Sequence, residues 1–384
     1  MRFALFWTFG TAIFFSCETG AVQEAKEDPL RTAAKWLWLQ QGRDGGWHSP
    51  KYGFLKGGET YTAFAMYALS LVPDSVWKPE ETAVNRGLNF IREHIRQNGV
   101  LGTGDSGILE YPNYATAYAL RVLIHHNREE DRGRIATVVQ YLRKEQFEGN
   151  RGISDTMAAY GAWGFGETNL KYGEFGYVDI SHTRRVTEAL NAAEQLDTHA
   201  IRACRSFLRL CQKHPADARV RAKSGGRKTG VPFDGGFFYS PVIEGANKGK
   251  SDSGNDSVPA YFKSYATATC DGILSLLGTG ATPGRNPDLD SAISWLRKRP
   301  EMDPPPGLPL DELEPWYKAM HYYHLMVRAE VYRKLGWDCG EIGRILSAEQ
   351  YEDGHFENRM SPLMKEDDPV LATCMAVIAM SNCR

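Results

Sequence analysis

A dense group of ionisable residues lies at the start of a predicted helix. Asp179, Ser181, His182, Arg184 and Arg185 fall within seven consecutive positions. A carboxylate that orients an imidazole leaves the second ring nitrogen able to act as a general base or to bind a ligand. Asp179, His182 and Arg185 are therefore candidate catalytic residues. A helix cap at Asp179 or Ser181, with the arginines paired to loop carboxylates, is the alternative interpretation.

A second polar and aromatic group lies between Trp316 and His324. Tyr317, His321 and His324 fall at positions i, i+4 and i+7, which share one face of a single helix. His321 is a candidate catalytic residue, and Trp316, Tyr317 and His324 are candidate ligand-binding residues, with core packing as the alternative. Two histidines without a clear carboxylate partner do not predict a metal site. We expect no metal and no cofactor.

Tyrosines recur at the heads of predicted helices, at Tyr61, Tyr114 and Tyr265. Aromatic faces suit an apolar or cationic ligand, and the hydroxyl groups can hold its polar end. We take these three as candidate ligand-binding residues. Ordinary packing explains them equally well.

The helices expected to position these residues belong to a repeated sequence unit. Residues 41–47 (QGRDGGW) and 350–356 (QYEDGHF) share the same spacing from Gln to Asp to Gly to an aromatic ring. Each follows an amphipathic segment and precedes, after a loop, a segment rich in small and aromatic residues. Such internal repetition predicts a repeated supersecondary unit. The turns themselves are interpreted as structural, because they tie helix ends together.

Helix start and stop signals predict a helix–loop–helix unit six times. The first helices carry Lys, Arg and Glu on one face and are expected outside, at 30–41, 82–97, 134–146, 198–212, 289–299 and 340–350. The second helices are rich in Ala, Thr, Ser and Gly and are expected inside, at 61–71, 114–125, 182–196, 265–277, 316–335 and 369–380. Alternating inner and outer helices can close into a ring, which removes exposed end faces.

The predicted fold is therefore all-α, an α/α toroid of six helical hairpins in one domain over residues 26–384. Three long loops are expected at 155–178, 214–263 and 300–315, and loops of this length are usually functional or disordered. Cys270 and Cys374 fall in small-residue helices and are expected as buried free thiols.

The N-terminus predicts export. Arg2 precedes an uncharged apolar run at 3–15, which is too short to span a bilayer, so residues 1–25 are interpreted as a signal peptide. A lipoprotein signal ending at Cys17, which would leave a lipid anchor, is the alternative. The protein is expected to be periplasmic, secreted or lipid-anchored at the cell envelope, with no transmembrane segment. A net charge of −2 gives no reason to expect nucleic acid as a partner. The oligomeric state stays open.

These features carry a family resemblance. The turn at 41–47 looks like the QW motif of triterpene cyclases, and six hairpins in a ring resemble the prenyltransferase and squalene-oxidase repeat superfamily of terpenoid cyclase-like toroids. The segments DGGFFYSP (234–241), SYATATCDGILSLL (264–277) and DISHTRRVTEALNAA (179–193) resemble an exported bacterial subset. The resemblance covers nearly the whole mature chain and implies the toroid fold.

The chemistries that the resemblance implies are incomplete in this chain. The cyclase acid lies in an Asp-x-Asp-Asp-Thr segment; Asp179 and Thr183 match it, but Ser181 and His182 replace the two later aspartates. A serine hydroxyl does not protonate an alkene at a useful rate. Zinc-dependent prenyltransferases need Asp, Cys and His ligands, and Cys374 has no histidine beside it. Standard squalene cyclisation is therefore doubtful, and whether the protein is an enzyme stays open.

Three functional hypotheses follow. The leading one is a central cavity that binds an isoprenoid or other lipid-like ligand. The second is a polysaccharide lyase-like enzyme on an anionic glycan, with His182 as base and Arg184, Arg185 and basic residues at 219–228 neutralising the substrate. The third is a non-catalytic surface interaction module whose long loops present a partner site.

Overall fold

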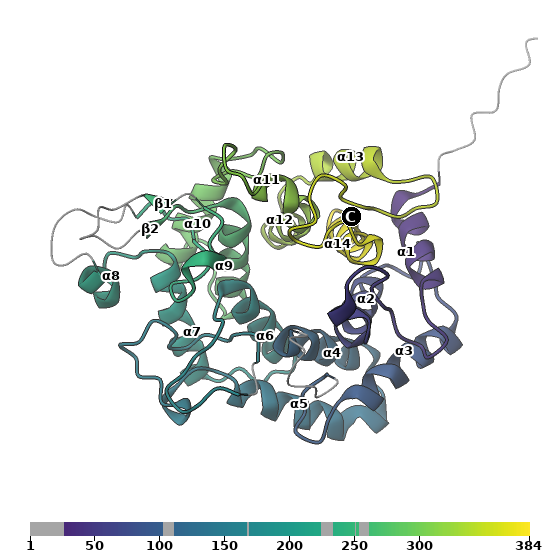
Figure 1. The fold of residues 1–384 in the computed structure, drawn as a ribbon, viewed down its shortest axis with the longest axis horizontal. Coiled ribbons are helices and arrows are strands. Elements are labelled where there is room, and N and C mark those ends of the chain that lie inside the picture. Colours follow the sequence, from purple (N-terminus) through teal and green to yellow (C-terminus); the bar gives the residue numbers. More distant parts are fainter. Residues whose placement is uncertain (1–26, 103–110, 167–168, 224–232, 250, 253–260) are drawn as a thin grey trace, which may run out of the picture.

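The computed structural model describes residues 27–102, 111–166, 169–223, 233–249, 251–252 and 261–384 (Figure 1). The predicted signal peptide and Cys17 lie outside these residues. The α-helices are α1 (Pro29–Leu39), α2 (Glu59–Ser70), α3 (Glu81–His94), α4 (Pro112–His126), α5 (Arg132–Lys144), α6 (Ile180–Ala192), α7 (Thr198–Cys211), α8 (Ala218–Lys223), α9 (Ala266–Gly278), α10 (Pro287–Arg297), α11 (Trp316–Ala319), α12 (His321–Leu335), α13 (Gly340–Glu349) and α14 (Pro369–Asn382).

Short elements fill the connections. Four 3₁₀ turns are η1 (Gly53–Leu55), η2 (Glu129–Asp131), η3 (Gly149–Arg151) and η4 (Glu244–Ala246). Strands β1 (Ser251–Asp252) and β2 (Tyr261–Phe262) pair antiparallel, with Ser251 opposite Phe262. None of the described helices has the length and apolarity needed to cross a bilayer.

The helices form a closed ring. Six of them, α2, α4, α6, α9, α12 and α14, stand around the centre, each packing against the next, and α14 packs against α2 to close the circle (Figure 1). The outer layer is α1, α3, α5, α7, α10 and α13. The prediction of an all-α toroid of six helical hairpins is confirmed. Because each outer helix alternates with an inner one, the six inner helices run in the same direction.

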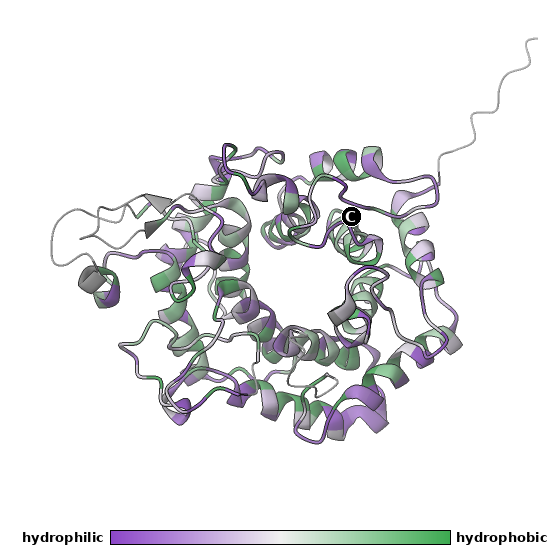
Figure 2. Cartoon of the chain, in the orientation of Figure 1, coloured by the Kyte–Doolittle hydropathy of each residue, from purple (hydrophilic) through white to green (hydrophobic). Residues whose placement is uncertain are grey.

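Composition explains which helix lies in which layer. Every residue from Ala266 to Leu276 in the inner helix α9 is buried. The outer helix α7 instead buries one face, which includes Phe207 and Cys211, and exposes charged residues on the other. Figure 2 shows this contrast, with hydrophobic colour concentrated on the inner helices and hydrophilic colour along outer ones such as α3 and α5. Cys270 and Cys374 are buried free thiols, as predicted.

The segment 316–335 is two helices, so the prediction of one continuous helix is wrong. The backbone of Met320 leaves the helical region (φ −105°, ψ 31°) and separates α11 from α12. The buried carboxylate of Glu366 accepts hydrogen bonds from the backbone N–H groups of Tyr322 (2.9 Å) and Tyr323 (2.8 Å). This side chain from the next hairpin caps α12 and fixes where it begins.

A glycine with left-handed backbone recurs in five of the turns between an outer and an inner helix. Its φ lies between 83° and 101°, and a Cβ at this position would lie 1.9–2.7 Å from a carbonyl oxygen of the next outer helix. Only glycine combines this conformation with so close an approach. The pairs of glycine and carbonyl are Gly45 with Arg86, Gly99 with Thr137, Gly161 with Ala203, Gly235 with Ser291, and Gly354 with Thr32.

Side chains complete these turns, with a threonine in all five and a glutamine in four. A threonine of the inner helix accepts a hydrogen bond (2.8–3.1 Å) from the backbone N–H two residues after the glycine; these are Thr62, Thr116, Thr183, Thr269 and Thr373. In four turns a glutamine that follows the outer helix donates to the glycine carbonyl and to a carbonyl in the first turn of the next outer helix; these are Gln41, Gln146, Gln212 and Gln350.

The ends of the chain are joined where the ring closes. Gln350 Nε2 donates to Pro29 O (2.8 Å), which links the last outer helix to the first. A disulfide joins Cys339, at the start of α13, to Cys383, at the end of α14. The last hairpin is therefore covalently closed and hydrogen-bonded to α1.

We predict that Gly161→Ala destabilises the ring far more than Gly280→Ala. Both glycines are left-handed (φ 83° and 79°), so both substitutions cost about 1–2 kcal/mol in backbone strain. Only the Gly161 Cβ meets a carbonyl, at 1.9 Å, whereas nothing lies within 4 Å of the Gly280 Cβ. Urea unfolding should show an additional loss of about 2–3 kcal/mol for Gly161→Ala. Equal losses would contradict the proposed contact.

Candidate functional site

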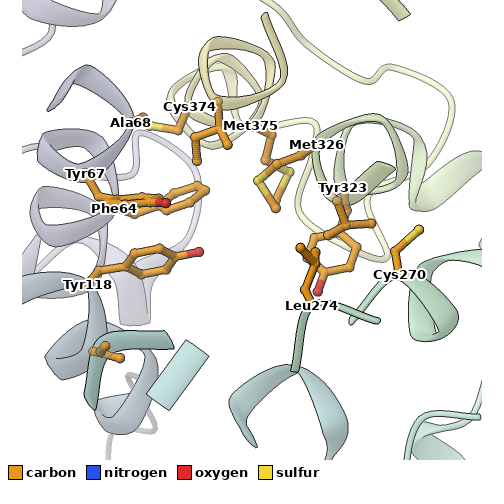
Figure 3. Close-up of a cluster of buried hydrophobic side chains, with 14 of the residues drawn as sticks. Phe64, Tyr67, Ala68, Tyr118, Cys270, Leu274, Tyr323, Met326, Cys374 and Met375 are labelled. Carbon is orange, nitrogen blue, oxygen red and sulfur yellow. The ribbon is translucent and has the colours of Figure 1, made fainter. Parts of the chain in front are cut away.

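A cavity of about 260 Å³ lies at the centre of the ring, where the inner helices begin. All six inner helices contribute to its wall from their caps and first two turns. Ten aromatic rings line it: Tyr61, Phe64, Tyr111, Tyr114, Tyr118, Phe165, Tyr177, Tyr239, Tyr265 and Tyr323. Four methionines also line it: Met320, Met326, Met364 and Met375. In Figure 3, Phe64 and Tyr118 face Tyr323, Met326 and Met375 across the interior.

The polar part of the wall is small. It consists of Thr60, Ser181, His182, Lys248 and Lys365, and no Asp or Glu belongs to the lining formed by the described residues. The surface offered to a ligand is therefore mainly apolar and aromatic. Burial raises the pKa of Tyr114 to about 12, so this phenol stays protonated at neutral pH.

Asp179 and His182 form a buried pair beside the cavity. Asp179 is the N-cap of α6, and its Oδ1 accepts from the backbone N–H groups of Ser181 (2.8 Å) and His182 (2.9 Å). Its Oδ2 lies 2.7 Å from His182 Nδ1. One carboxylate therefore both caps α6 and contacts the His182 ring, and a role of His182 towards a ligand stays a prediction.

The imidazole of His182 is enclosed by aromatic rings. Its centroid lies 4.3 Å from that of Tyr114 and 4.4 Å from that of Phe165. An ionised carboxylate only accepts, so Nδ1 carries the proton in this contact, and in the neutral imidazole Nε2 is then the acceptor. Nε2 is buried and has no hydrogen-bond partner within the described part of the chain. His182 thus combines a fixed tautomer with one unsatisfied nitrogen at the cavity wall.

Ser181 connects this pair to a cavity tyrosine. Its hydroxyl donates to Asp179 Oδ1 (2.8 Å) and lies 2.9 Å from the hydroxyl of Tyr239. Tyr239 lines the cavity, and burial raises its pKa well above the usual value. The chain Tyr239–Ser181–Asp179–His182 is a continuous hydrogen-bonded system along one wall.

Below the aromatic cavity lies a buried ion network, here called the floor network. Arg184 pairs with Asp271 (2.9 Å) and Glu330 (2.7 Å), and Arg185 pairs with Glu330 (3.0 Å) and Glu188 (3.2 Å). These residues come from α6, α9 and α12 and lie further along each helix than its lining residues. Asp271 also accepts from the hydroxyl of the lining residue Tyr323 (2.8 Å). The network therefore joins three of the six inner helices next to the cavity.

The prediction that Arg185 faces a ligand is corrected by this network. Its guanidinium is buried, lies 5.3 Å from the ring centroid of Tyr118 and is held by Glu330 and Glu188. Arg185 is not part of the cavity lining, although it is only three residues from His182. Successive residues of a helix point in different directions. Arg185 and His182 therefore have different neighbours, although they are close in sequence.

Tyr317 and His321 lie at a different place, in a surface depression between α11 and the turn after α13. His321 Nε2 lies 2.8 Å from Glu349 Oε2. Burial alone would lower the pKa of His321, but the hydrogen bond and charge of Glu349 outweigh it and raise that pKa. The assignment of His321 to a shared central site is therefore corrected.

His324 and Trp316 also lie away from the lining. His324 is fully buried in α12, and burial together with the positive charge of Arg328 lowers its pKa well below the usual value. It does not share a face with Tyr317, because the helix breaks at Met320. Trp316 is not part of the cavity lining, but the centre of its ring lies 3.6 Å from Nζ of the lining residue Lys248.

Among the predicted residues, Tyr61, Tyr114, Tyr265 and His182 line one cavity, with Asp179 directly behind His182. Sequence reasoning missed several lining residues. Tyr118 carried a usable signal, because it lies one turn after Tyr114 on the same helix face. The lining residues that lie in connections between helices carried no such signal in the sequence. They include Tyr111, Phe165, Tyr177, Lys248 and Lys365.

The sequence matches no protein-family model, and no curated protein is detectably related to it. The fold does have solved counterparts. A structure of the type II terpene cyclase MstE from Scytonema, in complex with merosterolic acid A, superposes with a TM-score of 0.52 at 13% identity and covers 92% of this chain and 95% of that chain. The same enzyme with geranylgeranyl dihydroxybenzoate gives 0.51 at 12% identity, with 92% and 96% covered.

A second counterpart is an α-amylase from Clostridium perfringens, with a TM-score of 0.53 at 11% identity and coverage of 94% and 100%. Identities this low establish the fold and no more. The chain therefore has a terpenoid cyclase-like α/α toroid fold.

We predict that Glu330→Gln lowers the free energy of unfolding far more than Glu352→Gln does. Glu352 is an exposed glutamate and serves as the control. Removing one partner of a buried ion network typically costs about 3–5 kcal/mol, because it leaves charge uncompensated. Burial alone would raise the pKa of Glu330, but Arg184 and Arg185 lower it. Its stabilisation is therefore lost as pH falls through the folded-state pKa. Urea unfolding across acidic pH should show a weaker pH dependence in Glu330→Gln; an unchanged profile would contradict this role.

Proposed function

We propose that this toroid binds a small isoprenoid or other lipid-like molecule in its central cavity. The observation that carries the proposal is the wall itself, with ten aromatic rings, four methionines and no carboxylate on the described lining. Such a wall favours transfer of apolar surface from water and offers aromatic faces to a hydrocarbon chain.

The structural counterparts support the same class of ligand. The Scytonema terpene cyclase holds geranylgeranyl dihydroxybenzoate and merosterolic acid A in a toroid of the same fold. The cavity here, about 260 Å³, is just below the usual range of about 300–1,000 Å³ for small-molecule sites. A short prenyl chain suits it better than a triterpene.

The polar wall supports proton exchange with a heteroatom rather than alkene protonation. Where the cyclases carry their acid, this chain has Ser181 and His182, and Nε2 of His182 is buried at the cavity wall without a hydrogen-bond partner among the described residues. An imidazole is not the strong acid that protonation of an alkene requires. We propose that His182 binds a hydroxyl or similar group of the ligand, with Asp179 as its orienting partner.

The glycan alternative receives less support. It needs Arg184 and Arg185 to neutralise an acidic sugar, but both are paired with carboxylates of the floor network. A glycoside hydrolase needs a pair of catalytic carboxylates, and the described cavity lining has none. The likeness to the α-amylase is thus a likeness of fold. The surface interaction module stays a hypothesis about the long loops.

Export to an oxidising compartment forms part of the proposal. The Cys339–Cys383 disulfide is of the kind that persists in periplasmic and secreted proteins. It supports the signal peptide predicted at residues 1–25 and the exported bacterial subset that the sequence resembles.

We predict that Leu371→Trp blocks ligand binding. Leu371 lines the cavity and is only partly buried, so an indole there can occupy the cavity without displacing core residues. Calorimetric titration with farnesol should show at least a tenfold loss of affinity, about 1.4 kcal/mol. Leu39→Trp, at an exposed position of the outer helix α1, is the matched control and should bind as the unsubstituted protein does. Absence of farnesol binding to the unsubstituted protein would refute the proposed ligand class.

We predict that His182→Gln weakens binding of an alcohol but not of the matching hydrocarbon. Loss of one hydrogen bond should reduce farnesol affinity by about 1 kcal/mol, roughly fivefold, and leave farnesene unchanged. His199→Gln, at an exposed site on α7, controls for the loss of an imidazole. A fall of equal size for farnesol and farnesene would mean that His182 only shapes the cavity.

A further inference from the structure

Three buried polar atoms of cavity-lining residues have no hydrogen-bond partner within the part of the chain that the structure describes. They are the hydroxyl oxygens of Tyr61 and Tyr265 and the Nε2 atom of His182. All three residues are nearly inaccessible to solvent. A buried polar atom without a partner costs free energy, so its presence in a folded protein requires an explanation. At the wall of a cavity, a bound ligand supplies one.

His182 and Tyr265 belong to the same sector of this wall. Helix α6 packs directly against α9, with His182 in the first turn of α6 and Tyr265 as the N-cap of α9. Tyr61 lies on α2, which stands across the ring from α9 (Figure 1). His182 and Tyr265 are therefore the two residues of the three that are placed to meet one polar group of a ligand.

The two atoms have complementary hydrogen-bonding roles. Nδ1 of His182 carries the proton in its contact with Asp179, so Nε2 of the neutral imidazole accepts. Burial raises the pKa of Tyr265 well above its usual value, the charges of Asp271 and Asp179 raise it further, and the backbone of Lys248 opposes this effect. The phenol therefore keeps its proton and donates.

Tyr265 is held at the wall by its backbone and its neighbours. Its N–H donates to the carbonyl of Phe237 (3.2 Å), and the N–H of Ala266 donates to the carbonyl of Pro306 (2.8 Å). A Cβ built on Gly249 would lie 3.2 Å from Cδ1 of the Tyr265 ring, so the backbone of that loop packs against the phenol. These contacts fix the donor on one side of the cavity sector, as Asp179 fixes the acceptor on the other.

We infer that the ligand carries one un-ionised hydroxyl group, which donates to Nε2 of His182 and accepts from the hydroxyl of Tyr265 while the apolar chain occupies the aromatic cavity. This inference rests on the proposed function and narrows it to a free alcohol. A hydroxyl both donates and accepts, so one such group satisfies both protein atoms. An ether oxygen only accepts and can satisfy Tyr265 alone.

The test uses three ligands that share a prenyl chain. Farnesol offers a donor and an acceptor, farnesyl methyl ether offers an acceptor, and farnesene offers neither. Each variant is compared with the unsubstituted protein for the same ligand by calorimetric titration, which removes differences in ligand size.

The two variants should give different patterns. Tyr265→Phe should weaken binding of farnesol and of the ether by about fivefold each, because both lose one hydrogen bond, and should leave farnesene within about twofold. His182→Gln should weaken only farnesol, again by about fivefold, because the ether has no proton to donate. Tyr172→Phe removes the hydroxyl of an exposed tyrosine and should leave all three affinities unchanged.

The stability of the free protein gives an independent readout. Tyr265→Phe removes a buried hydroxyl that has no partner among the described residues, so its midpoint of urea unfolding should equal or exceed that of the unsubstituted protein. A lower midpoint, with an equal loss of affinity for all three ligands, would mean that Tyr265 only packs, and would overturn the inference.

Further outcomes separate this inference from the proposed function. Unchanged farnesol affinity in Tyr265→Phe would overturn the inference, as would tighter binding of farnesyl phosphate than of farnesol to the unsubstituted protein. Both results would leave a lipid-binding cavity standing. Failure of farnesol, the ether and farnesene to bind would refute the proposed function itself.

Discussion

The structure depends on contacts between the backbone of one turn and the backbone of the next outer helix. At five turns a left-handed glycine lies so close to a carbonyl of the neighbouring hairpin that no Cβ fits between them. Each hairpin is thereby placed against the next at nearly van der Waals contact of main chains. The sixth connection, near α10 and α12, lacks this turn, and there Arg328 donates to the carbonyls of Arg299 and Glu301 instead.

The same turns determine where the inner helices begin. A threonine in the first turns of the inner helix accepts from the backbone just after the glycine, so the helix start is fixed relative to the outer layer. Because five starts are fixed in this way, the residues of the first turns meet at one level around the ring axis. Aromatic and methionine side chains at these positions then form a single wall, although they come from six hairpins.

Charge is distributed by depth within the ring. The deeper level holds Arg184 and Arg185 with three carboxylates from α6, α9 and α12, so two positive charges face three negative ones. The cavity above it keeps one oriented imidazole and two lysines. A ligand in this cavity therefore meets mainly apolar and aromatic side chains, with the Nε2 atom of His182 at one wall.

The sequence by itself determined the six hairpins, the assignment of inner and outer helices and the closed toroid, because glycine turns, threonines and helix periodicity act over short distances. It also identified Tyr61, Tyr114, Tyr265 and the Asp179–His182 pair. Only the tertiary structure decided that Arg185 is buried in a network, that His321 lies in a separate depression, and that Lys248 and Lys365 share the cavity. The reason is that ring closure brings together side chains such as Arg185 and Glu330, 145 residues apart, whose pairing no local pattern encodes.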